Sequence, residues 1–157
     1  MIRLVSMLEN EFDAYLEKTA PAYAAENVKA GYWPEEGALE RSRKVFENLL
    51  PQGVETENNY LFRIQLDENG EKIGVIWMKH EAPRSHGFIF DFVLDETERG
   101  KGYGKQAMLA LEEIAKEMGL ETLGLHVFTH NIPALKLYEK LGYEVTSQNM
   151  QKKLNPK

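Results

Sequence analysis

The spacing of apolar residues changes near residue 59, and this change constrains the fold more than any other feature of the chain. Residues 9–30 and 34–50 place apolar side chains at helical intervals, whereas residues 59–66 alternate with the two-residue period of a strand. Pro21 lies inside the first helical stretch, where we expect it to break or kink the helix. The other predicted strands are 2–7, 72–80, 87–94, 122–128 and 143–154, and the other predicted helices are 102–118 and 131–141.

This order of elements predicts the fold class. Three strands of antiparallel type, followed by strand–helix–strand units, are typical of a mixed sheet with helices on both faces. The connection from Phe88 to Phe128 is expected to be a right-handed crossover that joins two parallel strands. We therefore predict an α/β (α+β) fold in a single domain that spans residues 1–157.

Composition excludes several classes of function. The chain has 157 residues, no cysteine and a formal net charge of −6. Disulfides, thiolate catalysis and cysteine–zinc sites are therefore excluded, and the four histidines have no spacing typical of metal ligands. The negative charge disfavours nucleic acid, and no apolar run approaches the roughly 20 residues of a membrane span. We expect a cytoplasmic protein that binds no metal, nucleic acid or membrane.

A glycine-rich segment, Glu98 to Ala107 (ERGKGYGKQA), joins a predicted strand to a predicted helix. Glycines allow a close backbone approach, and the free N–H groups of a first helical turn favour an anion. A phosphate or pyrophosphate site is the natural inference, and the alternative is a tight turn with solubilising lysines. A Walker A loop is excluded because Gln106 stands where Ser or Thr is required. A dinucleotide fingerprint is matched by Gly102, Gly104 and Ala107, but the acidic residue expected about 20 positions later is missing.

Two motifs resemble those of the GNAT superfamily, the acetyl-CoA-dependent N-acetyltransferases. Arg99-x-x-Gly102-x-Gly104 resembles the family's cofactor loop, and the stretch from Asn131 through Ala134 and Tyr138 to Tyr143 is similar to its second signature. The resemblance covers about Phe88 to Tyr143. It implies a central sheet with a splayed pair of parallel strands, acetyl-CoA (coenzyme A) as cofactor and transfer of an acetyl group to an amine.

The resemblance also implies roles for individual residues. Tyr138 is the general acid for the CoA thiolate, the N–H of Leu94 stabilises the oxyanion, and His126 assists deprotonation of the amine. Asp91 and bulk water are the other candidates for the base. Each role competes with a structural one, because Tyr138 and His126 also suit packed positions and Asn131 suits a helix N-cap. The implied cofactor-binding residues are Phe92, Val93, Leu94, Arg99, Gly100, Lys101, Gly102, Tyr103, Gly104, Lys105, Asn131 and Ala134.

The acceptor stays open at this point. A small molecule or peptide with a primary amine is expected, and the chain is a monomer or a homodimer. Five residues are candidates to line the acceptor opening: Tyr23, Tyr32, Trp33, Glu35 and Glu36. Two other classes of function remain as alternatives: an acyl-CoA-binding sensor without catalysis on the same fold and, with less support, a nucleotide-dependent oxidoreductase.

Overall fold

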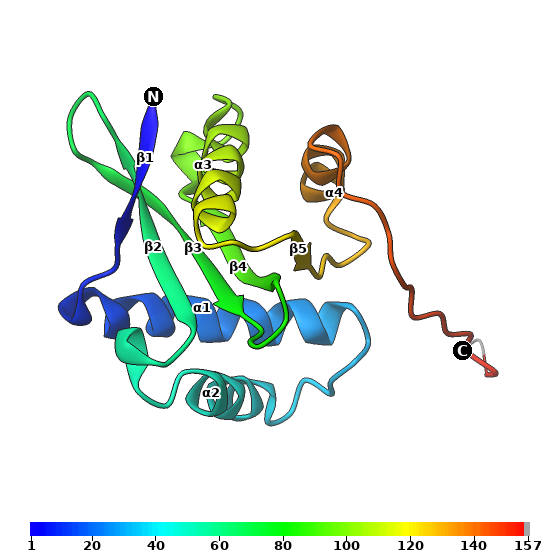
Figure 1. Cartoon of the computed structure of the whole chain (residues 1–157). Coiled ribbons are helices and arrows are strands. Elements are labelled where there is room, and N and C mark those ends of the chain that lie inside the picture. Colours follow the sequence, from blue (N-terminus) through cyan, green and yellow to red (C-terminus); the bar gives the residue numbers. More distant parts are fainter. Residues whose placement is uncertain (156–157) are drawn as a thin grey trace.

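The computed structural model describes residues 1–155 (Figure 1). Its strands are β1 (Ile2–Ser6), β2 (Asn59–Leu66), β3 (Lys72–His80), β4 (His86–Leu94) and β5 (Thr122–Leu125). Its α-helices are α1 (Glu9–Lys29), α2 (Ala38–Leu49), α3 (Tyr103–Glu117) and α4 (Ile132–Lys140), and short 3-10 turns cover Gly53–Glu55 and Glu96–Glu98. The predicted positions of β2 and β3 are confirmed to the residue, whereas β5 is three residues shorter than expected.

The five strands form one mixed sheet in the order β1-β2-β3-β4-β5. Strands β1 to β4 are antiparallel neighbours, and β5 runs parallel to β4. The parallel pair is the one that the crossover through α3 predicts. The predicted fold class is therefore confirmed: one domain with a mixed sheet between helices.

Two hydrophobic layers hold the helices to the sheet. On one face α1 and α2 pack on β2 and β3 around Trp77, which is 1% exposed and contacts the ring of Phe46. On the other face Met108 and Leu111 of α3 are fully buried against the sheet. Figure 1 shows α1 and α2 together on one side of the sheet and α3 on the other. Helix α4 lies beyond the end of β5.

Two expectations about single elements are not met: a break of the first helix at Pro21 and a strand at residues 143–154. Helix α1 continues without interruption through Pro21. Pro21 is exposed, so the carbonyl that loses its helical hydrogen bond can bond to water. The strand expected at residues 143–154 does not form; this stretch has no regular structure within the described residues. A strand needs a partner strand, and alternation in sequence does not supply one.

Candidate active site

The parallel strands β4 and β5 separate before β4 ends. They are paired from His86 with Thr122 to Ile89 with Leu125, and β4 then continues to Leu94 with β3 as its only partner among the described strands. A cleft of about 890 Å³ opens at this point and is lined by β4, α1, α2, α4 and residues 126–134. The splayed pair that the resemblance implies is therefore present, and it leaves one edge of β4 accessible.

A β-bulge shapes the wall of the cleft. The register of β3 and β4 shifts between Trp77, which pairs with Asp91, and Met78, which pairs with Ile89. Phe90 is the extra residue, so Phe90 and Asp91 both face α1 and α2 where plain alternation allows only one of them. Phe90 stacks on Trp77 with ring centroids 4.8 Å apart. The bulge thus directs a carboxylate into an aromatic layer.

Asp91 is held there by helix α1. The hydroxyl of Tyr15 donates a hydrogen bond of 2.6 Å to Asp91 Oδ2. Burial raises the pKa of the Asp91 carboxyl, although the bonds from Tyr15 and from the Phe92 N–H oppose that rise. Burial and the Asp91 charge likewise raise the pKa of Tyr15 well above its ordinary value. Asp91 is therefore a carboxylate with enhanced proton affinity that lines the cleft.

The glycine-rich segment forms a loop that ends at the first turn of α3. Gly100 and Gly102 have φ of 79° and 83°, a region that residues with a Cβ rarely adopt. Within residues 1–155, none of the N–H groups of residues 100–105 donates a hydrogen bond. These donors and the positive end of the helix dipole are therefore available to an anion, as the sequence predicts.

The side chains of the loop are less available than its backbone. Lys101 Nζ lies 3.2 Å from the Glu98 carboxylate, and Tyr103 packs against the core between α3 and the sheet. Arg99 Nε donates to the Leu94 carbonyl oxygen at 3.3 Å and lines the cleft. The backbone is therefore the main source of donors in this loop.

The N–H of Leu94 points into the cleft. The Asp95 N–H donates to Ile73 O of β3 at 2.7 Å, and successive strand residues direct their N–H groups to opposite edges. The N–H and C=O of Leu94 therefore face away from β3, in agreement with the bond from Arg99 to the Leu94 oxygen. Because β5 ends at Leu125, no strand within residues 1–155 covers this edge.

Helix α4 brings the second motif to the cleft. Asn131 is its N-cap, and its side-chain oxygen accepts from the Ala134 N–H at 3.4 Å, so the structural role expected for Asn131 is confirmed. Asn131, Ala134 and Tyr138 all line the cleft. Burial, with a smaller contribution from the Asp91 charge, raises the pKa of Tyr138 to about 12. Tyr138 thus stays protonated at neutral pH and shares the cleft with Asp91.

His126 follows directly after β5, is exposed and lines the cleft. Its ring meets the edge of Phe128, with centroids 4.9 Å apart. The structure thus brings Tyr138, His126 and the Leu94 N–H to the same cavity. Among the predicted loop residues with side chains, Lys101, Tyr103 and the exposed Lys105 do not line the cleft.

The mouth of the cleft contains residues that the sequence did not single out. Glu26 of α1 bonds to His130 Nε2, and His130 stacks on Phe128 at 5.5 Å. Of the five residues expected at the acceptor opening, Tyr23 alone lines this cleft, and Trp33 packs against Tyr23. No local pattern could have identified Tyr15 or Glu26, since each meets its partner only through the packing of α1 on β4 and on residues 126–130.

Comparison with known proteins agrees with this geometry. The model of the acetyltransferase (GNAT) family matches residues 21–143. The chain belongs to the GNAT acetyltransferase family. It is 46% identical to the uncharacterized N-acetyltransferase YycN of Bacillus subtilis, over 98% of this chain and 99% of that protein. A second B. subtilis relative, the uncharacterized N-acetyltransferase YdgE, is 39% identical over 96% and 97% of the two chains.

Solved structures give the same result. The crystal structure of YycN superposes with a TM-score of 0.93, at 45% identity and over 99% of both chains. The PaiA N-acetyltransferase of Thermoplasma acidophilum, crystallised with coenzyme A, shares the fold with a TM-score of 0.72 at 21% identity, over 95% and 93% of the chains. This GNAT chain is an acyltransferase, and acetyl-CoA is the cofactor of its family.

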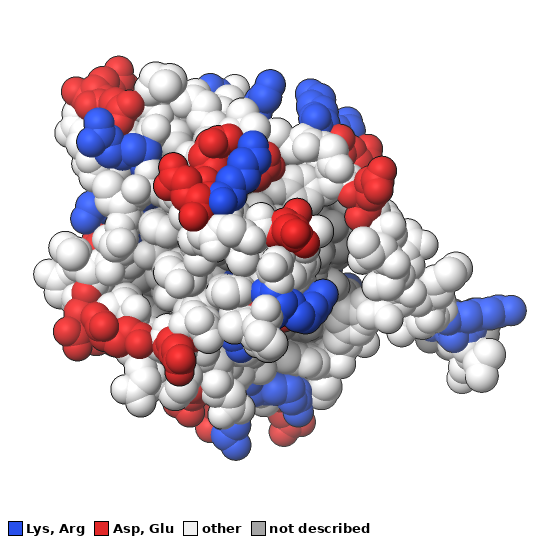
Figure 2. All heavy atoms as spheres, viewed as in Figure 1, with Lys and Arg blue, Asp and Glu red and all other residues white. Residues whose placement is uncertain are grey.

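Two further observations concern other kinds of site. Within residues 1–155, no group of three or more His, Asp or Glu residues is placed to hold a metal ion. None of the described helices has the length and apolarity to cross a membrane. The face in Figure 2 carries acidic and basic side chains in small groups, without a broad basic area.

Proposed function

We propose that this protein transfers the acetyl group of acetyl-CoA to a primary amine by direct attack. The observation that carries the proposal is that Leu94, Tyr138 and Gly104, which lies at the end of the glycine-rich loop, all line one cleft. The free N–H groups of residues 100–105 suit the CoA pyrophosphate, the Leu94 N–H suits an oxyanion, and Tyr138 suits a leaving thiolate. The uncovered edge of β4 at Phe92, Val93 and Leu94 supports a pantetheine arm that pairs with this strand.

The reaction needs two proton transfers. The amine must lose a proton as its nitrogen attacks the thioester carbon, and the sulfur must gain one when the C–S bond breaks. We assign the second transfer to Tyr138, whose raised pKa keeps it protonated and able to donate.

For the first transfer we favour Asp91 as the base, because its raised pKa gives it more affinity for the amine proton than an ordinary carboxylate has. His126 is the second candidate, since it lines the same cleft and histidine is the side chain that most often serves as a general base.

A non-catalytic acyl-CoA sensor remains as a second candidate, because the loop alone is sufficient for CoA binding. A tyrosine in the cleft with a carboxylate nearby favours an enzyme, since a sensor has no need of a proton donor.

The test is free-thiol release from acetyl-CoA across a library of primary amines, with Tyr138→Phe in parallel. Release that depends on both amine and enzyme supports the proposal. A thermal shift with acetyl-CoA and no release with any amine favours the sensor. A shift with NAD(P)H alone favours the oxidoreductase.

A further inference from the structure

One wall of the cleft is made of aromatic rings. Phe88 and Phe90 of β4 meet edge to face with ring centroids 4.9 Å apart, and Phe90 stacks on Trp77 at 4.8 Å. Tyr23 of α1 packs against the same layer and contacts Phe46 of α2 at 5.6 Å. All five rings line the cleft, and those of Tyr23, Phe88 and Phe90 are only half-buried. The half-buried rings keep apolar surface that a bound molecule can cover.

The β-bulge places this wall beside a carboxylate. Phe90 and Asp91 are consecutive residues, and the bulge is what lets both of them face α1 and α2. Both line the cleft, and the Tyr15 hydroxyl holds the Asp91 carboxylate in place. An amine that reaches Asp91 therefore has the ring of Phe90 next to it. The pair fits an amine whose body is apolar and aromatic.

The charges that line the cleft fit an acceptor with one amine rather than several. Two acidic residues, Glu26 and Asp91, and two basic residues, Lys29 and Arg99, line it, so their formal charges balance. Glu26 is already bonded to His130. Among the described residues of the lining, Asp91 is then the one carboxylate without a cationic partner. A second ammonium group would lose water without gaining a partner, which costs free energy.

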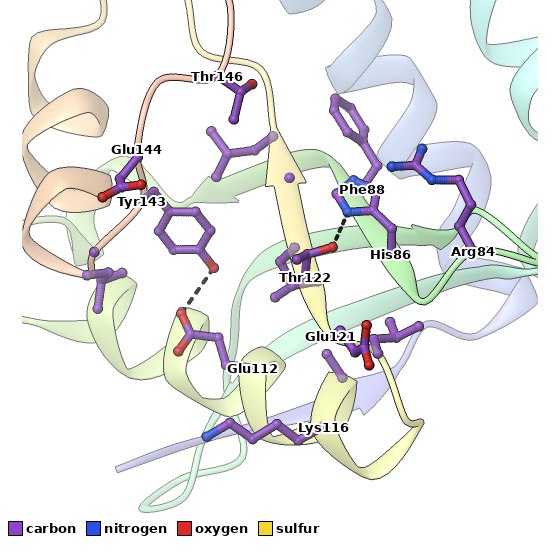
Figure 3. Close-up of a pocket in the computed structure, with 17 residues that line it drawn as sticks. Arg84, His86, Phe88, Glu112, Lys116, Glu121, Thr122, Tyr143, Glu144 and Thr146 are labelled. Atoms are coloured by element: carbon purple, nitrogen blue, oxygen red, sulfur yellow. Dashed lines mark hydrogen bonds between the residues drawn. The ribbon is translucent and has the colours of Figure 1, made fainter.

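A second hollow, of about 810 Å³ beside β5, has a different lining (Figure 3). Charged side chains of both signs surround it, such as Arg84 and Glu112. Asp91 does not line it, so an amine bound there would lie away from the reacting groups. Phe88 borders both hollows, whereas Phe90 lines the cleft and not this second hollow. Phe90 is therefore the better residue for a test.

We propose that the acceptor is an arylalkylamine, a primary amine joined by a short aliphatic chain to one aromatic ring. The inference rests on the proposed function and adds the class of amine to it. The amine lies at Asp91, and the ring lies against Phe90 and Tyr23, where contacts between rings favour it over an aliphatic chain. The products are the N-acetylated arylalkylamine and free CoA.

The test measures kcat/KM by free-thiol release from acetyl-CoA with three amines: 2-phenylethylamine, butylamine and 1,4-diaminobutane. Butylamine lacks the ring, and the diamine adds a second charge. The amines are compared in the wild type, Phe90→Leu and Phe12→Leu. Phe12 packs in the same apolar layer but does not line the cleft, so Phe12→Leu is the matched control. The ratio of two kcat/KM values within one variant does not depend on how much of that variant is folded.

In the wild type, kcat/KM for 2-phenylethylamine should exceed the values for the other two amines by at least tenfold. Phe90→Leu should reduce this preference by about threefold to tenfold, because contacts between rings are lost, whereas Phe12→Leu should keep it. Tyr23→Leu provides the same measurement from α1 if Phe90→Leu does not fold.

Several outcomes would overturn the inference and leave acetyl transfer intact. These are a preference for butylamine or 1,4-diaminobutane, release confined to amines without a ring, and an unchanged preference in both Phe90→Leu and Tyr23→Leu. An equal loss in Phe12→Leu would also overturn it, because the effect would then come from packing outside the cleft. No release with any amine would overturn the proposed function, and this inference with it.

Discussion

The cleft has two halves that the chain builds in different ways. The cofactor half, made of residues 99–105, the end of β4 and α4, comes from two short segments whose local geometry supplies the donors. The acceptor half, made of α1, α2 and residues 126–130, comes from side chains that meet only in the folded molecule, such as Glu26 and His130. Under the proposed function, we expect the backbone to recognise the cofactor and side chains to recognise the acceptor.

Asp91 belongs to both halves, since it lies on β4 and is held by Tyr15 of α1. Its replacement should therefore have the largest effect. Asp91→Asn keeps the shape and the bond from Tyr15 but cannot accept a proton, so kcat/KM at neutral pH should fall by about 10²–10⁴-fold, with CoA affinity unchanged. Steady-state kinetics and CoA titration measure the two quantities. Asp13→Asn, at an exposed position on α1, is the control.

The same variant tests the pKa of Asp91 through stability. Because burial raises the pKa in the folded state, the unfolded chain ionises first as pH rises, and the wild type loses stability up to the folded pKa. Asp91→Asn lacks this loss. The Tm of Asp91→Asn should exceed the Tm of the wild type at neutral pH. The difference between the two Tm values should narrow as pH falls toward the ordinary pKa range of carboxyl groups. A difference that widens in acid would contradict the raised pKa.

His126→Ala separates the two candidates for the base. If Asp91 is the base, kcat/KM of His126→Ala should depend on pH in the same way as kcat/KM of the wild type. A selective loss of kcat/KM below neutral pH, where free amine is scarce, would move the role to His126.

Tyr138→Phe should have the next largest effect, and it lies within the cofactor half. The change removes the hydroxyl and keeps the ring, so the fold and CoA affinity should stay within a few-fold of wild type. A thiol of ordinary pKa, about 8.5, is a tolerable leaving group, so kcat should fall by about 10-fold to 10²-fold. Tyr143→Phe is the matched control, because that hydroxyl bonds to Glu112 outside the cleft. Full activity in Tyr138→Phe, with chemistry limiting the rate, would leave Tyr138 a packing residue.

Sequence was informative where function resides in a local segment. The loop, the N-cap at Asn131 and the position of Tyr138 follow from short spacings, because the backbone of one turn determines them. The side-chain contacts of the acceptor half could not be predicted from short spacings. The hydrogen bond from Tyr15 to Asp91, for example, joins residues that are 76 positions apart in the sequence. The bulge at Phe90 was also missed, because it appears only in the register of two paired strands. The wrong prediction of a last strand has a similar cause. Alternation can be seen in the local sequence, but the sequence does not show whether a partner strand is available.

Gly104→Val tests the cofactor half directly and should have a smaller effect. A Cβ at Gly104 meets Leu137 at 3.4 Å, an ordinary contact, so the fold should persist. Bulk at the first turn of α3 should obstruct the pyrophosphate and raise the Kd of CoA by about tenfold, roughly 1.4 kcal/mol. Gly104→Ala is the graded control, and its Kd for CoA should lie between the values of the wild type and Gly104→Val. Wild-type affinity in a folded Gly104→Val protein would contradict the phosphate assignment.

Glu26→Gln should have the smallest effect, and it isolates the acceptor half. The Glu26 side chain is 43% exposed, so water screens its charge, and pairs of this kind contribute about 0.2–1 kcal/mol. For a cationic acceptor, loss of the charge should raise the acceptor KM by roughly 1.4-fold to 5-fold, while kcat and the Kd of CoA stay constant. Glu17→Gln, on the same helix but outside the cleft, is the matched control. An equal rise of the acceptor KM in both variants would indicate that the effect comes only from the long-range attraction between the protein's charge and the acceptor. A change in CoA affinity without a change in acceptor KM would contradict the division of the cleft into two halves, because Glu26 would then act on the cofactor.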